Sequence, residues 1–216
     1  MTAKSGGSEG SIVWGGTAGL MVLLVLLSFA QGGGTEACLR RIIRGTAQVG
    51  APLFAAAFAA RPLHQLRGSR VSRWLLRNRR VLGLSFAIAH FTHLGALAGL
   101  GWGCCPEPFR SDLDPLTLGV GGLAYFLLAA MTLTSFDRPA AWLGAHRWKL
   151  LHRLGSYVLG LVLLANYLEL VIGEGRGALQ ALSLAAAFAL RAGARARPVR
   201  RARVVAPGSQ PPTVGG

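Results

Sequence analysis

Charged residues are scarce in this 216-residue sequence: they make up 14% of it, and only eight residues are Asp or Glu. Soluble domains carry about a quarter of their residues as charged side chains, so the composition excludes that class. The hydrophobic fraction of 52% excludes a chain that is disordered over most of its length. An integral membrane protein with basic loops remains. The length allows about six spans with short connections. We expect no soluble flavin or nicotinamide domain beside them, because such a domain needs on the order of 100 residues or more.

Signatures of catalysis are also absent. The sequence contains no nucleophile elbow, no P-loop, no HExxH pair and no dinucleotide-binding fingerprint, so we expect no catalytic residue. Its three cysteines do not have the spacing of a zinc site. Cys38, Cys104 and Cys105 fall in segments that we expect on the outer side of the membrane. A disulfide from Cys38 to one of the other two and free thiols are both open alternatives there.

Long apolar runs, by contrast, are abundant. Six of them are candidate spans: 12–30, 42–60, 81–102, 116–134, 151–172 and the short, Ala-rich 178–190. They predict an all-α integral membrane protein, a bundle of about six transmembrane helices over 12–190. An N-terminal tail (1–11) precedes the bundle, and a basic, Pro/Gly-rich tail (191–216), which we expect to be disordered, follows it. The first run also has the features of a signal peptide, so cleavage of residues 1–30 stays open.

Arginines gather at one set of span ends. The segments 61–80 and 135–150 and the C-terminal tail are rich in Arg, whereas 103–115 is acidic. The positive-inside rule places the basic segments, and with them the C-terminus, on the cytoplasmic side of a bacterial inner-type membrane. The net charge of +15 does not indicate nucleic-acid binding, because these arginines lack interleaved aromatic residues, and contact with the lipid bilayer explains them better. Three arginines break the rule, and we expect their side chains to snorkel to the interface: Arg40, Arg41 and Arg44.

Histidines inside the predicted spans are the candidate functional residues, because an ionisable group is costly in a membrane. His90 and His93 lie three residues apart, on neighbouring parts of one helical face. His152 opens another span. Imidazoles from two helices can hold a haem iron from both sides, which suits electron transfer. Hydrogen bonding between helices is the alternative. The remaining two histidines, His64 and His146, are expected in solvent or at the interface.

Three stretches of the sequence resemble a known family in the right order. Residues 78–93 are similar to the third-span motif of ferric reductase-like transmembrane domains, and 134–154 to the run into the fifth span. Arg61-Pro62-Leu63 resembles the end of the second span. The resemblance extends over residues 42–172. This family includes the membrane parts of ferric reductases and NADPH oxidases and the haem-binding subunit MsrQ of a methionine sulfoxide reductase system.

The resemblance implies haem b between the third and fifth spans. His93 matches the family's third-span histidine and His152 its first fifth-span histidine. The second fifth-span histidine, about thirteen residues further on, has no counterpart in 164–167, so at most one haem is expected. His90, about 4.5 Å nearer the inner side than His93, is the alternative mate for His152. The expected iron ligands are thus His93 and His152, with His90 as a further cofactor-binding candidate.

The resemblance further implies a b-type cytochrome-like subunit that relays electrons across the membrane, an oxidoreductase component without its own flavin or nicotinamide domain. The electron donor would be a flavoprotein or a quinol, so flavin or quinone would enter through a partner, and the acceptor would lie on the outer side. The alternative is a haem-free structural or assembly subunit that kept the fold and lost ligands. A transporter is disfavoured, because the spans show no inverted repeat.

Overall fold

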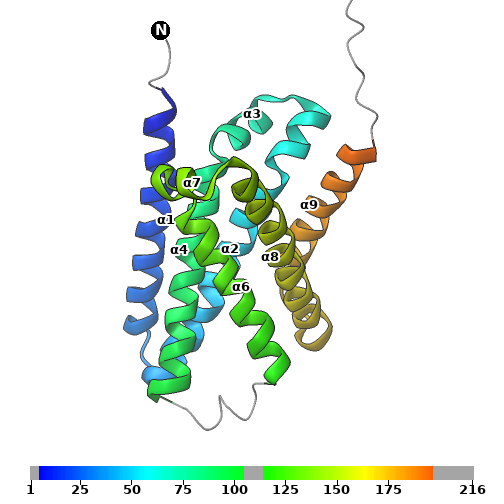
Figure 1. Ribbon diagram of the computed structural model, residues 1–216. Helices are drawn as coiled ribbons and strands as arrows, with labels where there is room; N and C mark the ends of the chain where they lie inside the picture. Colours follow the sequence, from blue (N-terminus) through cyan, green and yellow to red (C-terminus); the bar gives the residue numbers. More distant parts are fainter. Residues whose placement is uncertain (1–4, 105–113, 197–216) are drawn as a thin grey trace, which may run out of the picture.

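The computed structural model describes residues 5–104 and 114–196, and almost all of them are helical (Figure 1). In chain order the elements are α1 (Ser5–Ala30), α2 (Gly34–Arg67), α3 (Arg70–Arg77), α4 (Arg79–Ala98), the π-helical turn η1 (Gly99–Cys104), α6 (Pro115–Leu133), α7 (Asp137–Leu143), α8 (Ala145–Glu174) and α9 (Ala178–Ala196). The predicted all-α fold is confirmed.

Within the described residues, five helices are long and apolar enough to cross a membrane. They are Gly10–Ala30, Gly34–Arg67, Arg79–Cys104, Pro115–Leu133 and Ala145–Glu174. The sixth predicted span forms most of α9, which is helical but is not among these five. Helix α1 begins within the predicted N-terminal tail, and residues 191–196 of the predicted C-terminal tail continue α9. The rest of that tail, 197–216, lies outside the described residues.

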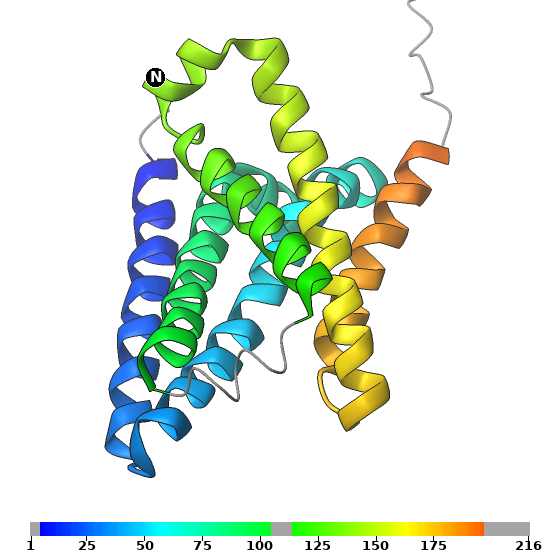
Figure 2. The same ribbon diagram turned by 60° about the horizontal axis from the view of Figure 1, so that its bottom comes forward.

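Helix α2 lies in the middle of the bundle and packs against α1, α3, α4, α8 and α9, while α6 lies between α4 and α8 (Figure 2). The buried phenylalanines of α2 form the centre of the core. Phe54 stacks on Phe58 at 5.4 Å between ring centroids and meets Phe86 of α4 at 5.0 Å. Leu159 of α8 and Leu184 of α9 close the same cluster. Apolar burial between helices, rather than a polar network, therefore joins the helices here.

The basic segments lie at one end of the bundle. Helices α3 and α7 and the C-terminal end of α9 lie at the top of Figure 1, and the turn between α1 and α2 lies at the bottom. We call the end at the top the basic end and the end at the bottom the opposite end. The segments 61–80 and 135–150 thus share one end, as the charge pattern predicted.

Arginines at the opposite end have local partners. Three successive glycines turn the chain between α1 and α2, with φ of 65°, 87° and 82° at residues 32–34, where side chains are strained. Arg41 Nη2 donates to the carbonyl oxygen of Ser28, at 2.7 Å, and to that of Gly32. The Arg41 guanidinium thus binds one carbonyl in the last turn of α1 and one in the turn that follows it. Arg40 Nε donates to Glu36 Oε1 at 2.8 Å, whereas Arg44 is exposed.

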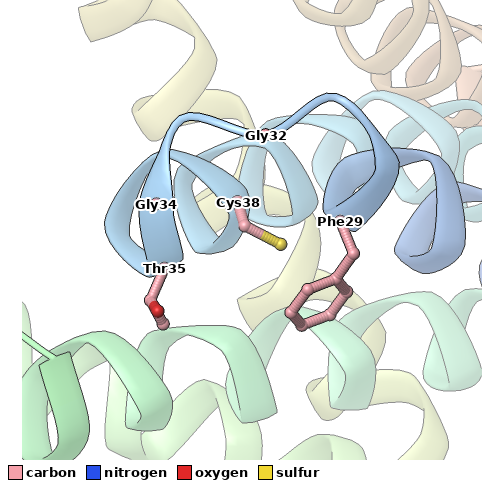
Figure 3. Close-up of a pocket in the computed structure, with 5 residues that line it drawn as sticks. All are labelled: Phe29, Gly32, Gly34, Thr35 and Cys38. Atoms are coloured by element: carbon pink, nitrogen blue, oxygen red, sulfur yellow. The ribbon is translucent and has the colours of Figure 1, made fainter.

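A small hollow adjoins this turn (Figure 3). Phe29, Gly32, Gly34, Thr35 and Cys38 line it. Cys38 is buried and its thiol is free, so the structure favours the free-thiol alternative for this residue. Cys105, one of the two bridging partners considered above, lies outside the described residues.

Candidate functional site

His93 of α4 is held by the backbone and a side chain of α2. Its Nδ1 lies 3.0 Å from the carbonyl oxygen of Ile43 and 3.1 Å from Thr46 Oγ1. A carbonyl oxygen only accepts hydrogen bonds, so Nδ1 carries the proton. The Thr46 hydroxyl donates to the carbonyl oxygen of Ile42 at 2.7 Å and can accept from the same Nδ1–H. This tautomer leaves the lone pair on Nε2, the arrangement that a metal-binding histidine needs.

His90 lies one turn nearer the basic end, in a space that α2 leaves open at Gly50. A Cβ added at Gly50 would lie 2.5 Å from His90 Cε1 and 2.7 Å from its Nδ1. The His90 ring lies 4.1 Å from Phe86 and 5.9 Å from His93 between centroids. The prediction that the two histidines share one side of the helix is confirmed. His90 Nδ1 is buried and has no hydrogen-bond partner among the described residues.

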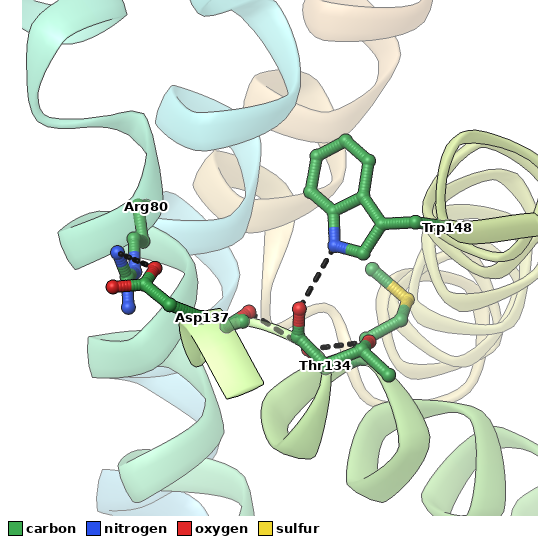
Figure 4. Close-up of polar contacts among 6 residues, drawn as sticks. Arg80, Thr134, Asp137 and Trp148 are labelled. Atoms are coloured by element: carbon green, nitrogen blue, oxygen red, sulfur yellow. Dashed lines mark hydrogen bonds and ion pairs between the residues drawn. The ribbon is translucent and has the colours of Figure 1, made fainter. Parts of the chain in front are cut away.

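His152 occupies a different place, where α6 meets α8. Its Nε2 lies 3.1 Å from Thr134 Oγ1, and its ring lies 4.4 Å from Trp148. The Trp148 indole donates to the Thr134 carbonyl oxygen at 2.8 Å, and Arg80 pairs with Asp137 beside this junction (Figure 4). The Thr134 hydroxyl already donates to the carbonyl oxygen of Ala130. It therefore accepts from His152 Nε2–H, and the ring joins two helices.

The other two histidines lie outside the bundle interior. His64 Nδ1 is 3.3 Å from Ser72 Oγ. That hydroxyl donates to the carbonyl oxygen of Ser69 at 2.9 Å, so it accepts from the histidine. His64 thus connects the end of α2 to α3. His146 is exposed at the start of α8.

The depth of each histidine along the bundle decides which of them can share a site. His93 bonds to Thr46, and Phe58 lies twelve residues further along α2 toward the basic end, about 18 Å. The Phe58 and Tyr157 rings meet at 5.4 Å. His152 lies five residues, about 7.5 Å, nearer the basic end than Tyr157. His93 and His152 therefore differ in depth by about 25 Å, and the structure does not bring them to one iron atom.

The residue of α8 that lies level with His93 is Tyr167. Its hydroxyl donates to the carbonyl oxygen of Ala47 at 2.7 Å, and Ala47 follows Thr46 directly. Tyr167 is fifteen residues, about 22 Å, from His152, which agrees with the depth obtained through the core. Tyr167 is buried, whereas Ala165 and Asn166 beside it are exposed.

Three neighbours of the histidines were not predicted as part of the site. Thr46 and Gly50 share the face of α2 that meets α4, and Tyr167 reaches that face from α8. A hydroxyl in an apolar span needs a partner, and that is the signal by which Tyr167 and Thr46 could have been found. Gly50 offers no such signal, because its role is to leave space for the His90 ring of α4, which the sequence around Gly50 does not reveal.

Most of the segment from α2 to α8, which positions these groups, matches a described family. Residues 44–163 match the family called ferric reductase like transmembrane component. The chain belongs to this family. The membership that the sequence motifs implied is thereby confirmed, and His90, His93 and His152 all lie within the matched region.

The chain is also similar to the protein-methionine-sulfoxide reductase heme-binding subunit MsrQ of Ralstonia nicotianae. It is 31% identical over 135 residues, which cover 60% of this chain and 58% of the relative. The chain thus spans a little over half the length of that relative. No solved structure matches the chain.

Proposed function

We propose that this protein is a haem-binding membrane subunit that transfers electrons across the bilayer. The similar MsrQ protein is named as a heme-binding subunit, and the family is that of the ferric reductase like transmembrane component. The observation that carries the proposal for this chain is His93: an imidazole inside a membrane span, its Nδ1–H bonded to the Ile43 carbonyl and its Nε2 lone pair left for a metal.

The side chains present fit a haem better than a metal ion bound by side chains alone. No group of three His, Cys, Asp or Glu that could hold a metal ion occurs within residues 5–104 and 114–196. A haem iron asks the protein only for axial ligands, and when bound the haem supplies one-electron transfer. His93 would be the ligand, with Ile43 and Thr46 fixing its orientation. His90, whose buried Nδ1 has no partner among the described residues, is the second candidate beside it.

The proposed haem site differs from the predicted bis-histidine site in its second iron ligand, which is not His152. The sequence predicts His93 and His152 on one iron, but these residues differ in depth by about 25 Å. We therefore assign one haem to the level of His93 and regard His152 as a residue that positions α8 against α6. At the level of His93, α8 offers the phenol of Tyr167 and no imidazole. An iron held by one histidine is expected to be high-spin, whereas two histidines give a low-spin spectrum.

Electrons would enter and leave through partners. A flavoprotein on the cytoplasmic side or a quinol in the bilayer is the proposed donor, and the acceptor lies at the outer side. In this arrangement the basic end of the bundle and the C-terminus face the cytoplasm. The bundle would contribute a position for the haem and an apolar surrounding that excludes water and tunes its potential.

A haem-free structural subunit is the second candidate, and the packing of α8 favours it. Tyr167 closes directly on α2 through its bond to the Ala47 carbonyl. Ala165 and Asn166, the positions near which the family commonly has a second histidine, are exposed. A member that had lost haem would keep the fold through contacts of this kind.

An optical spectrum separates the two candidates. The protein is purified in detergent from cells supplied with haem, and spectra are recorded oxidised and dithionite-reduced, with a pyridine haemochrome count. About one haem b per chain, lost in His93→Ala and retained in His152→Ala, is the expected result. Loss in His152→Ala with retention in His93→Ala would contradict the assigned ligand. Absence of haem from a folded wild-type protein would establish the structural subunit instead.

A further inference from the structure

Four arginines from three helices converge near the basic end of the bundle. They are Arg61 of α2, Arg79 of α4, and Arg191 and Arg195 of α9. The charges of the other three all act on Arg191, and Arg61 also acts on Arg79. Arg79 Nε donates to the carbonyl oxygen of Ala57 at 3.2 Å, which directs its side chain along α2. We call these four residues the arginine cluster.

Aromatic rings hold the centre of the arginine cluster in place. The Arg191 guanidinium lies over the Phe58 ring at 3.9 Å and over the Tyr157 ring at 4.9 Å from the ring centroids. Arg195 lies 5.2 Å from the Tyr157 centroid. Contacts of this kind attract the cation to the ring face and fix its direction. Arg191 Nη1 is nevertheless buried without a hydrogen-bond partner among the described residues, so one strong donor of the group is unused.

No acidic residue neutralises the arginine cluster within the part of the chain that the structure describes. The ion pairs found there are Arg40–Glu36, Arg80–Asp137 and Arg176–Glu174, and none includes a cluster residue. Like charges at close range repel one another. A buried donor atom without a partner, such as Arg191 Nη1, is also unfavourable. An anion bound among the four arginines would remove both penalties.

The surroundings indicate what kind of anion this is. The cluster lies where α2 ends and α4 begins, the depth at which lipid headgroups meet a membrane protein. Leu161 lies one turn further from the basic end than Tyr157, on the same face of α8, and is 55% exposed. A ligand seated at the arginines can therefore extend an acyl chain along an apolar surface. Guanidinium groups bind phosphate oxygens in pairs, which suits a phosphate headgroup.

We propose that the arginine cluster binds the phosphate group of an anionic phospholipid between α9 and the ends of α2 and α4. Phosphate is the chemistry recognised, and a water-soluble phosphate is the other source that would present it. The lipid is favoured by the exposed Leu161 beside the site. This proposal does not depend on haem binding, because none of the four arginines is among the haem-ligand candidates.

The test is a lipid titration of the detergent-purified full chain. Short-chain phosphatidylglycerol and phosphatidylcholine are titrated separately, with binding followed by native mass spectrometry and by the melting temperature. Phosphatidylglycerol is expected to bind more tightly, and Arg191→Gln to weaken it by about fivefold, the effect of one cation near an anionic lipid. Arg138→Gln is the matched control, because Arg138 is exposed at the same end in α7 and should leave the affinity unchanged.

The outcomes that overturn the proposal are distinct. Equal affinity for the two lipids, or an equal loss in Arg138→Gln, would show that no specific anion site exists. Displacement of phosphatidylglycerol by inorganic phosphate as effectively as by lipid would make a soluble phosphate the occupant and overturn the lipid assignment. Should Arg191→Gln fail to fold, Arg195→Gln removes an exposed member of the cluster and gives the same comparison. Haem content, measured in the same samples, is expected to stay unchanged in every arginine variant.

Discussion

Gly50→Ala tests the packing around His90 by adding a single atom, the Cβ of alanine, next to the His90 ring. The added Cβ would lie 2.5 Å from His90 Cε1 and 2.7 Å from Nδ1, closer than carbon and nitrogen atoms can approach without movement. The His90 ring is confined by Phe86, at 4.1 Å between centroids, so it cannot shift freely. Overpacking of a closed interior lowers stability by about 1–3 kcal/mol. We expect a loss of that size, measured by reversible unfolding in detergent or mixed micelles.

Gly95→Ala is the matched control for this prediction. Gly95 lies on α4, the helix that carries His90, and a Cβ there would meet nothing within 4 Å. Alanine in an open helical position is neutral or stabilising by up to about 1 kcal/mol. The double variant Gly50→Ala/His90→Ala should regain part of the loss, because the obstructing ring is gone, and the double-mutant cycle measures that coupling. If Gly50→Ala is as stable as Gly95→Ala, His90 does not face α2 at this position.

Two further substitutions test contacts at the opposite half of the bundle. Tyr167→Phe removes the hydrogen bond to the Ala47 carbonyl and should lower the free energy of unfolding by about 1 kcal/mol. Tyr125→Phe is the control, because the Tyr125 hydroxyl of α6 has no hydrogen-bond partner among the described residues. An equal effect of the two substitutions would contradict the contact. Arg41→Gln removes the guanidinium that binds the carbonyls of Ser28 and Gly32 and should destabilise the turn between α1 and α2 by about 1–2 kcal/mol, seen as a lower melting temperature. Arg44→Gln, at an exposed position of the same helix, should have no such effect, and a comparable loss there would indicate a general charge effect.

Hydrophobic runs predicted where five spans lie, but not where their helices end. The run 42–60 lies within the longer helix α2, Gly34–Arg67, and the run 151–172 lies within the longer helix α8, Ala145–Glu174. The extra turns contain Arg, His and Gln, which a hydropathy window assigns to loops although their backbone continues the helix. One of these side chains, Arg40, donates to Glu36 of the same helix at 2.8 Å. Apolarity therefore locates a span, while capping residues set its ends.

The basic segments were predicted as loops, and most of their residues are helical. Arg70–Arg77 forms α3 and Asp137–Leu143 forms α7. A local signal existed for α3: the side chain of Ser69 accepts from the Ser72 backbone at 3.2 Å, as an N-cap serine does. Asp114 caps α6 in the same way, since its carboxylate accepts from the Thr117 backbone. Charge indicated the end of the bundle, but it carried no information on local secondary structure.

The histidines show which part of the site cannot be predicted from a single span. Spacing of three residues was enough to predict that His90 and His93 share one side of α4, because both lie on one helix. Whether His152 lies level with them depends on how α8 is offset against α2 and α4. That offset is fixed by contacts between residues distant in sequence, such as Phe58 with Tyr157 and Ala47 with Tyr167. No pattern within a single span contains it.

The rotation of α8 also bears on what the missing histidine means. A histidine thirteen residues after His152 would stand at 165, and Ala165 is exposed, as is Asn166. Each residue turns the helix by about 100°, so Tyr167 faces the interior about 200° away from position 165. A histidine introduced at 165 alone would therefore lie on the outside of the bundle. A second histidine at this level of α8 would thus require both the side chain and a rotation of α8 different from the one in which Tyr167 bonds to the Ala47 carbonyl.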